Sequence, residues 1–218
     1  MWNCIVFGAT GSVGREVVHA LAVSSSWSNI IVVGRNILPE HEKYQSDARF
    51  RFFVTDNVMD FGLLRSVYIR NLHINVIFNF IAAESGFSSE EIRMLEVSWP
   101  LQLLNLAQDL RCELYSKVIS RYAKPNSMLE LFRMQAEFVD EAQLQTLDNI
   151  TIFKPGVLLS RRHNPRCGAG FFSALFCMKR IEVVDLAVQI LKDAELTLNS
   201  KSKRGFQVYE HDQILKLL

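Results

Sequence analysis

The sequence has few cysteines and prolines, no excess of charge of one sign, and no long hydrophobic run. Four cysteines in 218 residues, none of them in a CxxC pair, are too sparse for a disulfide scaffold. Only five prolines and 22% charged residues argue against a largely disordered chain. The balance of 24 basic and 23 acidic side chains argues against general nucleic-acid binding. No apolar run reaches the roughly 20 residues that a membrane-spanning helix needs, so no transmembrane segment is predicted.

The cysteines and the N-terminus indicate an intracellular protein. Cys4, Cys112, Cys167 and Cys177 are expected to be reduced thiols. The chain enters an apolar segment at residue 4 without a basic region or a cleavage site, so no secretory signal is predicted. We therefore expect a cytoplasmic or mitochondrial location. His163 and Cys167 could contribute to a zinc site, but no second pair stands at ligand spacing, and no metal site is predicted.

Short apolar runs alternate with segments of helical periodicity along the whole chain. The 49% hydrophobic content suffices for the core of one domain. Strands separated by helices of this length predict an α/β, Rossmann-type doubly wound parallel sheet with helices on both faces. We expect a single domain over residues 1–218, with a variable substrate-side loop at about 160–180 and a short C-terminal extension. Strands are predicted at 4–7, 30–33, 50–54, 75–81, 114–119, 150–153 and 206–209, and helices at 13–23, 61–72, 88–110 with a kink at Pro100, 127–147, 181–192 and from 211.

A glycine-rich loop lies directly between the first predicted strand and the first predicted helix. In the segment GATGSVG, Gly8 allows a sharp turn and Gly11 removes a side chain where a diphosphate would approach the helix N-terminus. Gly14 allows the helix to pack closely on the sheet. This context predicts a dinucleotide-binding loop rather than a simple tight turn. The loop residues assigned to the cofactor are Gly8, Thr10, Gly11, Ser12, Val13 and Gly14.

The end of the second predicted strand favours NADP(H) over NAD(H). An NAD site usually has an acidic residue there for the adenosine ribose, whereas this sequence has Gly34 and Arg35. A guanidinium can bind a 2′-phosphate through two hydrogen bonds, although Arg35 could also be an ordinary surface arginine. Asp56 is expected either to contact the adenine or to cap a helix. The backbone after the fourth strand is expected to line the cofactor at Phe80, Ile81 and Ala82.

The glycine loop, the strand end Val33-Gly34-Arg35 and the run FKPGVLL at 153–159 together resemble a known family. They are similar to atypical short-chain dehydrogenase/reductases, and most nearly to the Tat-interacting-protein type. The resemblance covers nearly the whole chain, and the FKPGVLL run is its most discriminating part. It implies NADP(H) binding on a Rossmann-type domain. It also adds Pro155, Gly156 and Val157 to the expected cofactor site.

The family pattern includes a catalytic Tyr-x-x-x-Lys pair on a helix and a serine at the preceding strand end. The two residues share one helix face, so the ammonium lowers the pKa of the phenol and allows it to transfer a proton. Aligned on that pattern, Ser120 takes the serine position, but Leu131 and Gln135 take the tyrosine and lysine positions. Leucine has no proton to give, while the amide of Gln135 could still bind a ribose hydroxyl. The sequence therefore predicts that Ser120 and Gln135 contact the cofactor and that the usual catalysis is lost.

Two functions follow from this pattern, besides the possibility that the pocket has decayed and only the fold survives. The first is an NADP(H)-binding protein without the usual chemistry, acting as a structural or regulatory subunit with a protein partner. The second is an active NADP-dependent oxidoreductase on a carbonyl or alcohol, with an acid–base pair drawn from Tyr122 and Lys124 or from Tyr115 and Lys117. Aromatic residues that could serve an interface, or simply pack in the core, are Trp2, Trp27, Trp99, Phe171 and Phe172.

Overall fold

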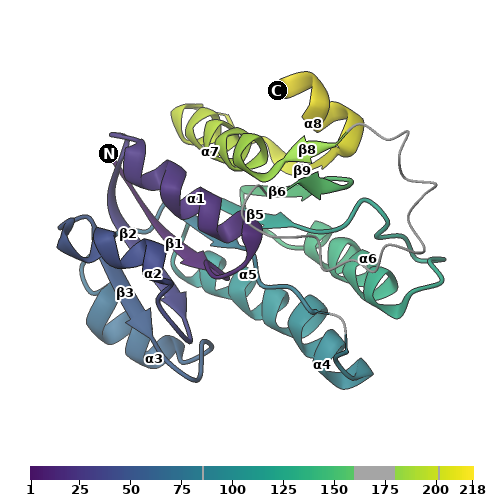
Figure 1. Cartoon of the computed structure of the whole chain (residues 1–218), viewed down its shortest axis with the longest axis horizontal. Coiled ribbons are helices and arrows are strands. Elements are labelled where there is room, and N and C mark those ends of the chain that lie inside the picture. Colours follow the sequence, from purple (N-terminus) through teal and green to yellow (C-terminus); the bar gives the residue numbers. More distant parts are fainter. Residues whose placement is uncertain (85, 160–179, 201) are drawn as a thin grey trace.

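The computed structural model describes residues 1–84, 86–159, 180–200 and 202–218. Within these ranges a seven-stranded sheet has the order β3-β2-β1-β4-β5-β6-β9, and every neighbouring pair is parallel. The predicted Rossmann-type single domain is thereby confirmed (Figure 1). The last strand is an integral edge of this sheet and not an appendage. The strands are β1 (Trp2–Phe7), β2 (Trp27–Gly34), β3 (Phe50–Val54), β4 (Val76–Asn79), β5 (Leu114–Val118), β6 (Asn149–Lys154) and β9 (Gly205–Glu210).

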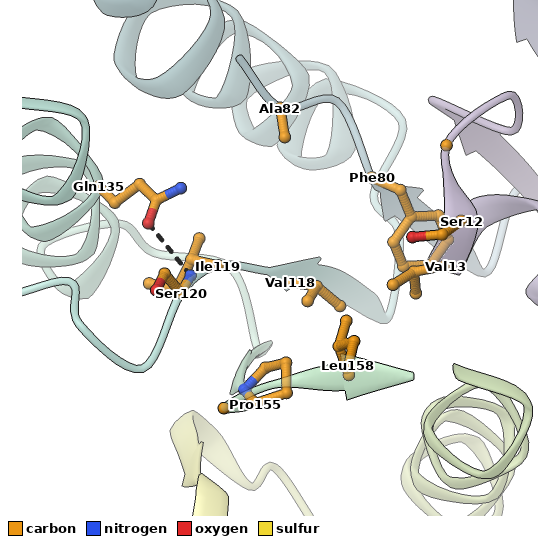
Figure 2. A pocket seen from close by; sticks show the side chains of 12 residues that line it. Ser12, Val13, Phe80, Ala82, Val118, Ile119, Ser120, Gln135, Pro155 and Leu158 are labelled. Atoms are coloured by element: carbon orange, nitrogen blue, oxygen red, sulfur yellow. Dashed lines mark hydrogen bonds between the residues drawn. The ribbon is translucent and has the colours of Figure 1, made fainter. Parts of the chain in front are cut away.

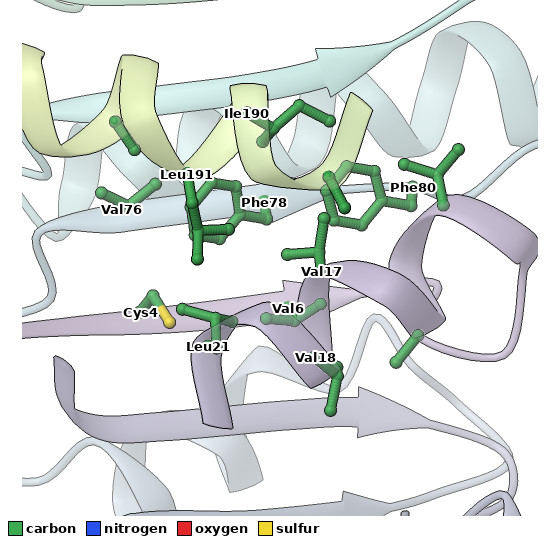
Figure 3. Close-up of a cluster of buried hydrophobic side chains, with 14 of the residues drawn as sticks. Cys4, Val6, Val17, Val18, Leu21, Val76, Phe78, Phe80, Ile190 and Leu191 are labelled. Atoms are coloured by element: carbon green, nitrogen blue, oxygen red, sulfur yellow. The ribbon is translucent and has the colours of Figure 1, made fainter. Parts of the chain in front are cut away.

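The helices cover both faces of the sheet, because side chains alternate along each buried strand. On β1, Cys4 and Val6 face a core cluster with α1 (Ser12–Val23) and α7 (Val183–Asn199) (Figure 3). Ile5 and Phe7 face the opposite cluster. That second cluster is closed by α5 and α6 (Figure 1). The bounds of α5 are Trp99–Asp109 and those of α6 are Glu130–Gln143. The period of two in these strands thus produces two cores, one on each side.

Two of the predicted helices are interrupted by a π-helical turn. The segment predicted as one helix over 61–72 is α3 (Phe61–Leu63) followed by a π turn at Leu64–Tyr68. The segment predicted over 88–110 is α4 (Ser89–Arg93), a π turn at Met94–Ser98, and then α5.

The second π turn explains how the chain tolerates Pro100. Pro100 lies in the first turn of α5, and a proline ring inside a helix clashes with the carbonyl four residues earlier. That residue is Glu96, in the middle of the π turn, whose wider winding relieves this clash. The expected kink at Pro100 is therefore a π turn just before it.

Several short elements have no clear sequence signal. The segment after β2 forms α2 (Pro39–Glu42) and a 3₁₀ turn (Lys43–Ser46). A two-stranded parallel sheet pairs β7 (Leu158–Leu159) with β8 (Ile181–Glu182). Residue 181 is thus in a strand rather than in the predicted helix, and α7 begins at 183 and continues to 199. The chain ends in α8 (His211–Leu217), as predicted.

The segment before α6 is a turn, although the periodicity predicts helix from residue 127. The guanidinium of Arg133 donates hydrogen bonds to the carbonyl oxygens of Ser127 and Met128, both at 2.9 Å. These bonds hold residues 127 and 128 in a non-helical conformation before the first helical residue, Glu130. Side-chain bonds to the backbone of this kind compete with helix formation.

Two of the four cysteines lie in the described core. Cys4 and Cys112 are buried free thiols, one in each core cluster. Burial raises the pKa of Cys4 and raises that of Cys112 to about 12. None of the described helices is long and apolar enough to cross a membrane. No group of three potential metal-ligating side chains occurs in the described ranges, and His163 and Cys167, the two residues considered for a zinc site, lie outside them.

The charged side chain of Arg204, in the segment between α7 and β9, joins these two elements. The guanidinium of Arg204 lies 2.8 Å from Oδ1 of Asp193, whose side chain is only 3% exposed. The Tyr209 hydroxyl donates to the same oxygen at 2.9 Å. Since a buried carboxylate without partners is costly, this ion pair stabilises the edge of the sheet.

Removing the cation from this pair should destabilise the fold. Arg204→Met leaves Asp193 buried without its charged partner, and we expect it to lower the free energy of unfolding by about 3 kcal/mol. Lys203→Met is the matched control, because its ion pair with Asp148 is exposed and should contribute about 1 kcal/mol or less. Urea denaturation of both variants measures the difference, and equal losses would contradict the assigned role of Arg204.

Candidate functional site

A cavity opens at the carboxyl edge of the sheet, where the strand order reverses. β1 leads to β2 on one side and lies beside β4 on the other, so the loops after β1 and β4 diverge there. Ligands of open α/β sheets bind at such a point. The cavity has a volume of about 290 Å³ (Figure 2). Its lining residues are Gly11, Ser12, Val13, Phe80, Ala82, Val118, Ile119, Ser120, Gln135, Pro155, Gly156 and Leu158.

The glycine loop places the start of α1 against this cavity. Gly8 has φ +77°, and a Cβ there would lie 2.5 Å from the carbonyl carbon of Phe80. A Cβ at Gly14 would lie 2.3 Å from the carbonyl oxygen of Gly8. Both positions therefore exclude a side chain, in agreement with their predicted roles. At Gly11 the nearest atom would be 3.5 Å away, so this glycine is needed for no contact within the protein.

The N-terminus of α1 has the properties of an anion site. Its N-cap residue is Gly11, which provides no side-chain cap, and the first turn contains no acidic residue. Gly11, Ser12 and Val13 line the cavity, so the amides of this turn begin at its wall. Unpaired amides and the helix dipole favour a negative group there.

The structure brings most of the predicted cofactor residues together. From the glycine loop, the segments that follow β4, β5 and β6, and α6, it gathers nine of them around one cavity. These nine are Gly11, Ser12, Val13, Phe80, Ala82, Ser120, Gln135, Pro155 and Gly156. The other seven predicted cofactor residues are not among the described lining residues. They are Gly8, Thr10, Gly14, Arg35, Asp56, Ile81 and Val157.

The two residues expected near the adenosine are exposed at strand ends. Arg35 directly follows Gly34, the last residue of β2. Asp56 is exposed two residues beyond β3. The alternative that Asp56 caps a helix is wrong, because Asp60 caps α3 by accepting a hydrogen bond from the Leu63 amide at 3.1 Å. The contacts of Arg35 and Asp56 with a nucleotide stay predictions.

Sequence reasoning missed three lining residues. Val118 and Ile119 precede Ser120 at the end of β5, and Leu158 follows Gly156 in the small sheet. Their positions beside predicted site residues were the available signal. As apolar side chains they carry no chemical pattern of their own, so only the geometry of the strand ends assigns them to the cavity.

The positions of the family's catalytic pair lie on one face of α6. Leu131 and Gln135 are four residues apart on this helix. Of the two, Gln135 lines the cavity and Leu131 does not. Its side chain is buried, and its Oε1 accepts a hydrogen bond from the Ser120 amide at 3.1 Å (Figure 2). The Ser120 hydroxyl accepts one from the Tyr122 amide at 3.2 Å and keeps its own proton for donation.

Neither alternative acid–base pair lines the cavity. Tyr115 and Lys117 do share one face of β5, but both are fully buried. The Tyr115 hydroxyl accepts a hydrogen bond from Nδ2 of Asn79 at 2.8 Å, and burial raises the pKa of this phenol above its usual value. Tyr122 and Lys124 are exposed on the loop after β5. The described lining thus contains no titratable side chain.

The aromatic residues considered for an interface mostly belong to the core. Trp27 is fully buried and packs edge-on against Trp2 at 5.7 Å between ring centroids. Trp2 and Trp99 are each partly buried against a core cluster. Phe171 and Phe172 lie outside the described residues. An interface role for Trp27 is therefore wrong.

Comparison with known proteins supports the fold assignment. No protein-family model matches the sequence. A curated protein of Aspergillus terreus, "Protein fmp52-1, mitochondrial", is 22% identical over 168 residues, which are 76% of this chain and 71% of that protein. The short-chain dehydrogenase/reductase YIR035C of Saccharomyces cerevisiae superposes with a TM-score of 0.72 at 12% identity, over 100% of both chains.

A second type of structural relative comes from sugar-nucleotide enzymes. The dTDP-glucose 4,6-dehydratase of Bacillus anthracis, solved with NAD, gives a TM-score of 0.70 at 19% identity over 96% of this chain and 74% of its own. The chain shares the fold of these enzymes. At such identities the likeness concerns the fold alone.

Alanine substitutions at Gly14 and Gly11 test which of these glycines the fold itself requires. Gly14→Ala places a Cβ against the Gly8 carbonyl, and we expect it to lower the free energy of unfolding by about 1–3 kcal/mol. Gly11→Ala meets only ordinary contacts at φ −71° and should change it by less than about 1 kcal/mol. Thermal and urea unfolding of both variants measure these changes. A stable Gly14→Ala protein would show that α1 does not sit as closely as described.

Proposed function

We propose that this protein binds a nicotinamide dinucleotide, NADP(H) in preference to NAD(H), without the usual tyrosine–lysine catalysis. One observation carries the proposal. The first turn of α1 opens into a cavity at the sheet's switch point, and the described lining of that cavity has no titratable side chain. Uncapped amides suit a diphosphate, whereas a lining without acid or base offers little for proton transfer.

The fold comparisons agree with dinucleotide binding. The dehydratase of Bacillus anthracis was solved in complex with NAD, and this chain superposes on it with a TM-score of 0.70. The residues present here fit such a group: the amides at Ser12 and Val13 would hold the diphosphate, and Pro155 and Gly156 would hold the nicotinamide end. When bound, the cofactor would supply hydride chemistry.

The role proposed for the protein is that of a regulatory or structural subunit that works with a protein partner. Bound dinucleotide stabilises the folded chain by mass action, whether or not it turns over. The name of the Aspergillus relative makes the mitochondrion the compartment to examine first.

The preference for NADP(H) is tested at Arg35. An exposed guanidinium at the end of β2 can bind the 2′-phosphate, which NAD(H) lacks. We expect Arg35→Ala to weaken NADPH binding about tenfold, because one charge-assisted hydrogen bond is lost, and to leave NADH binding unchanged. Isothermal titration with both cofactors measures this. Equal weakening of both would contradict a 2′-phosphate contact.

The loss of catalysis is tested by turnover. General acid–base catalysis typically raises a reaction rate 10²–10⁴-fold. We therefore expect the protein to bind NADPH but not to oxidise it above the background rate when aldehydes and ketones are offered as substrates. Ser120→Ala should then leave that background rate unchanged. Robust oxidation that Ser120→Ala abolishes would overturn the proposal and establish an oxidoreductase that uses the retained serine.

A further inference from the structure

Three buried polar side chains lie together behind the cavity. Glu96 comes from the π turn before α5, Lys117 from β5 and Gln135 from α6. Glu96 and Lys117 are 0% exposed, and Gln135 is 5% exposed. Burial lowers the pKa of Lys117, and the nearby charge of Glu96 opposes that shift. Buried charges are expensive, so each must have partners that compensate for lost water.

Two of these side chains fix the backbone after β4. The ammonium of Lys117 donates a hydrogen bond to the Ile81 carbonyl oxygen at 3.0 Å. Oε1 of Glu96 accepts one from the Ala83 amide at 2.7 Å. These two hydrogen bonds fix the backbone on both sides of Ala82, which lines the cavity. One wall of the cavity is therefore held by a buried cation and a buried anion.

Gln135 links this wall to the opposite one, and its orientation is forced. The Ser120 amide can only donate, so it must meet Oε1, which it does at 3.1 Å. Oε2 of Glu96 accepts from Nε2 of Gln135 at 3.2 Å. Nε2 carries two protons, and only one of them is used by this bond. Figure 2 shows the amide nitrogen of Gln135 on the side of the cavity, between Ala82 and Ser120.

We propose that Glu96 and Lys117 are positioning residues that lock both backbone walls of the cavity and make Gln135 present an N–H donor to its ligand. The group recognised by this donor is an oxygen acceptor, of which a ribose hydroxyl of the dinucleotide is the candidate. This last point rests on the proposed function. In this proposal Gln135, which aligns with the lysine of the family that the sequence resembles, is the neutral centre of a hydrogen-bond chain from Ala83 to Ser120.

An exchange of the acid and the amide tests the chain of bonds. Glu96→Gln has one donor too many, because its own amide nitrogen then faces that of Gln135. Gln135→Glu has one hydrogen-bond donor too few, because the carboxylates at positions 96 and 135 then face each other. We expect each single variant to lower the melting temperature by roughly 5 °C and to shift the amide resonances of Ala83 and Ser120.

The double variant E96Q/Q135E restores each hydrogen bond between Ala83 and Ser120, with the charge moved by one side chain. Gln at 96 accepts from Ala83 and donates to Glu at 135, whose second oxygen accepts from Ser120. We expect its melting temperature and both amide resonances to return toward those of the unaltered protein. Failure of this rescue would overturn the positioning role. Glu137→Gln is the matched control, because its ion pair with Arg93 lies on the exposed side of α6.

NADPH affinity tests the donor separately. The double variant has no N–H at position 135, so we expect its NADPH binding to stay about tenfold weaker although its walls are restored. Full recovery of affinity would overturn the assignment of Gln135 as a donor to the ligand. If the unaltered protein bound no dinucleotide, the proposed function would fail, whereas the melting temperatures and amide resonances would still decide the positioning role.

Discussion

The site depends on the contact between the start of α1 and the turn that precedes it. The carbonyl oxygen of Gly8 occupies the place where a Cβ of Gly14 would be, and the backbone at Phe80 excludes one at Gly8. These two close approaches bring the helix terminus to the point where the loops after β1 and β4 separate. The cavity, its amide-lined wall and the packing of α1 against α7 all follow from that placement.

The opposite side of the cavity is built from a different kind of interaction. Here a continuous chain of hydrogen bonds runs through Glu96 and Gln135 between two loops that are far apart in sequence. An enzyme of the resembling family would need a phenol and an ammonium in this region. This chain has hydrocarbon at Leu131, and the amide of Gln135 contacts Ser120 and Glu96, so the polar groups described here connect the two sides of the cavity.

The sequence allowed the sheet and much of the cavity to be predicted, because both depend on local patterns. Continuous apolar runs identify buried parallel strands, and the spacing of Gly8, Gly11 and Gly14 identifies the turn into α1. The π turns could not be predicted, since the clash of Pro100 with the preceding turn has more than one solution.

Long-range polar contacts were also beyond sequence reasoning. Arg204 belongs to a charged run that is typical of a solvated loop, and only the fold brings it to Asp193. In the same way, Glu96 lies in the segment predicted as one helix over 88–110, and no local pattern identifies it as a buried residue. The π turn directs it inward, to Gln135 on another helix. Periodicity assigns a residue to a face, but it does not identify its partner.

The buried thiols of Cys4 and Cys112 can report separately on the unfolding of the two helical layers that cover the sheet. Cys4 lies in the core beneath α1 and α7, and Cys112 lies in the core beneath α5 and α6. Because a thiol-alkylating reagent must reach a sulfur before it can react, modification of either one requires that its own layer open. Mass-resolved labelling would therefore time the loosening of each side of the sheet independently, within a single unaltered polypeptide.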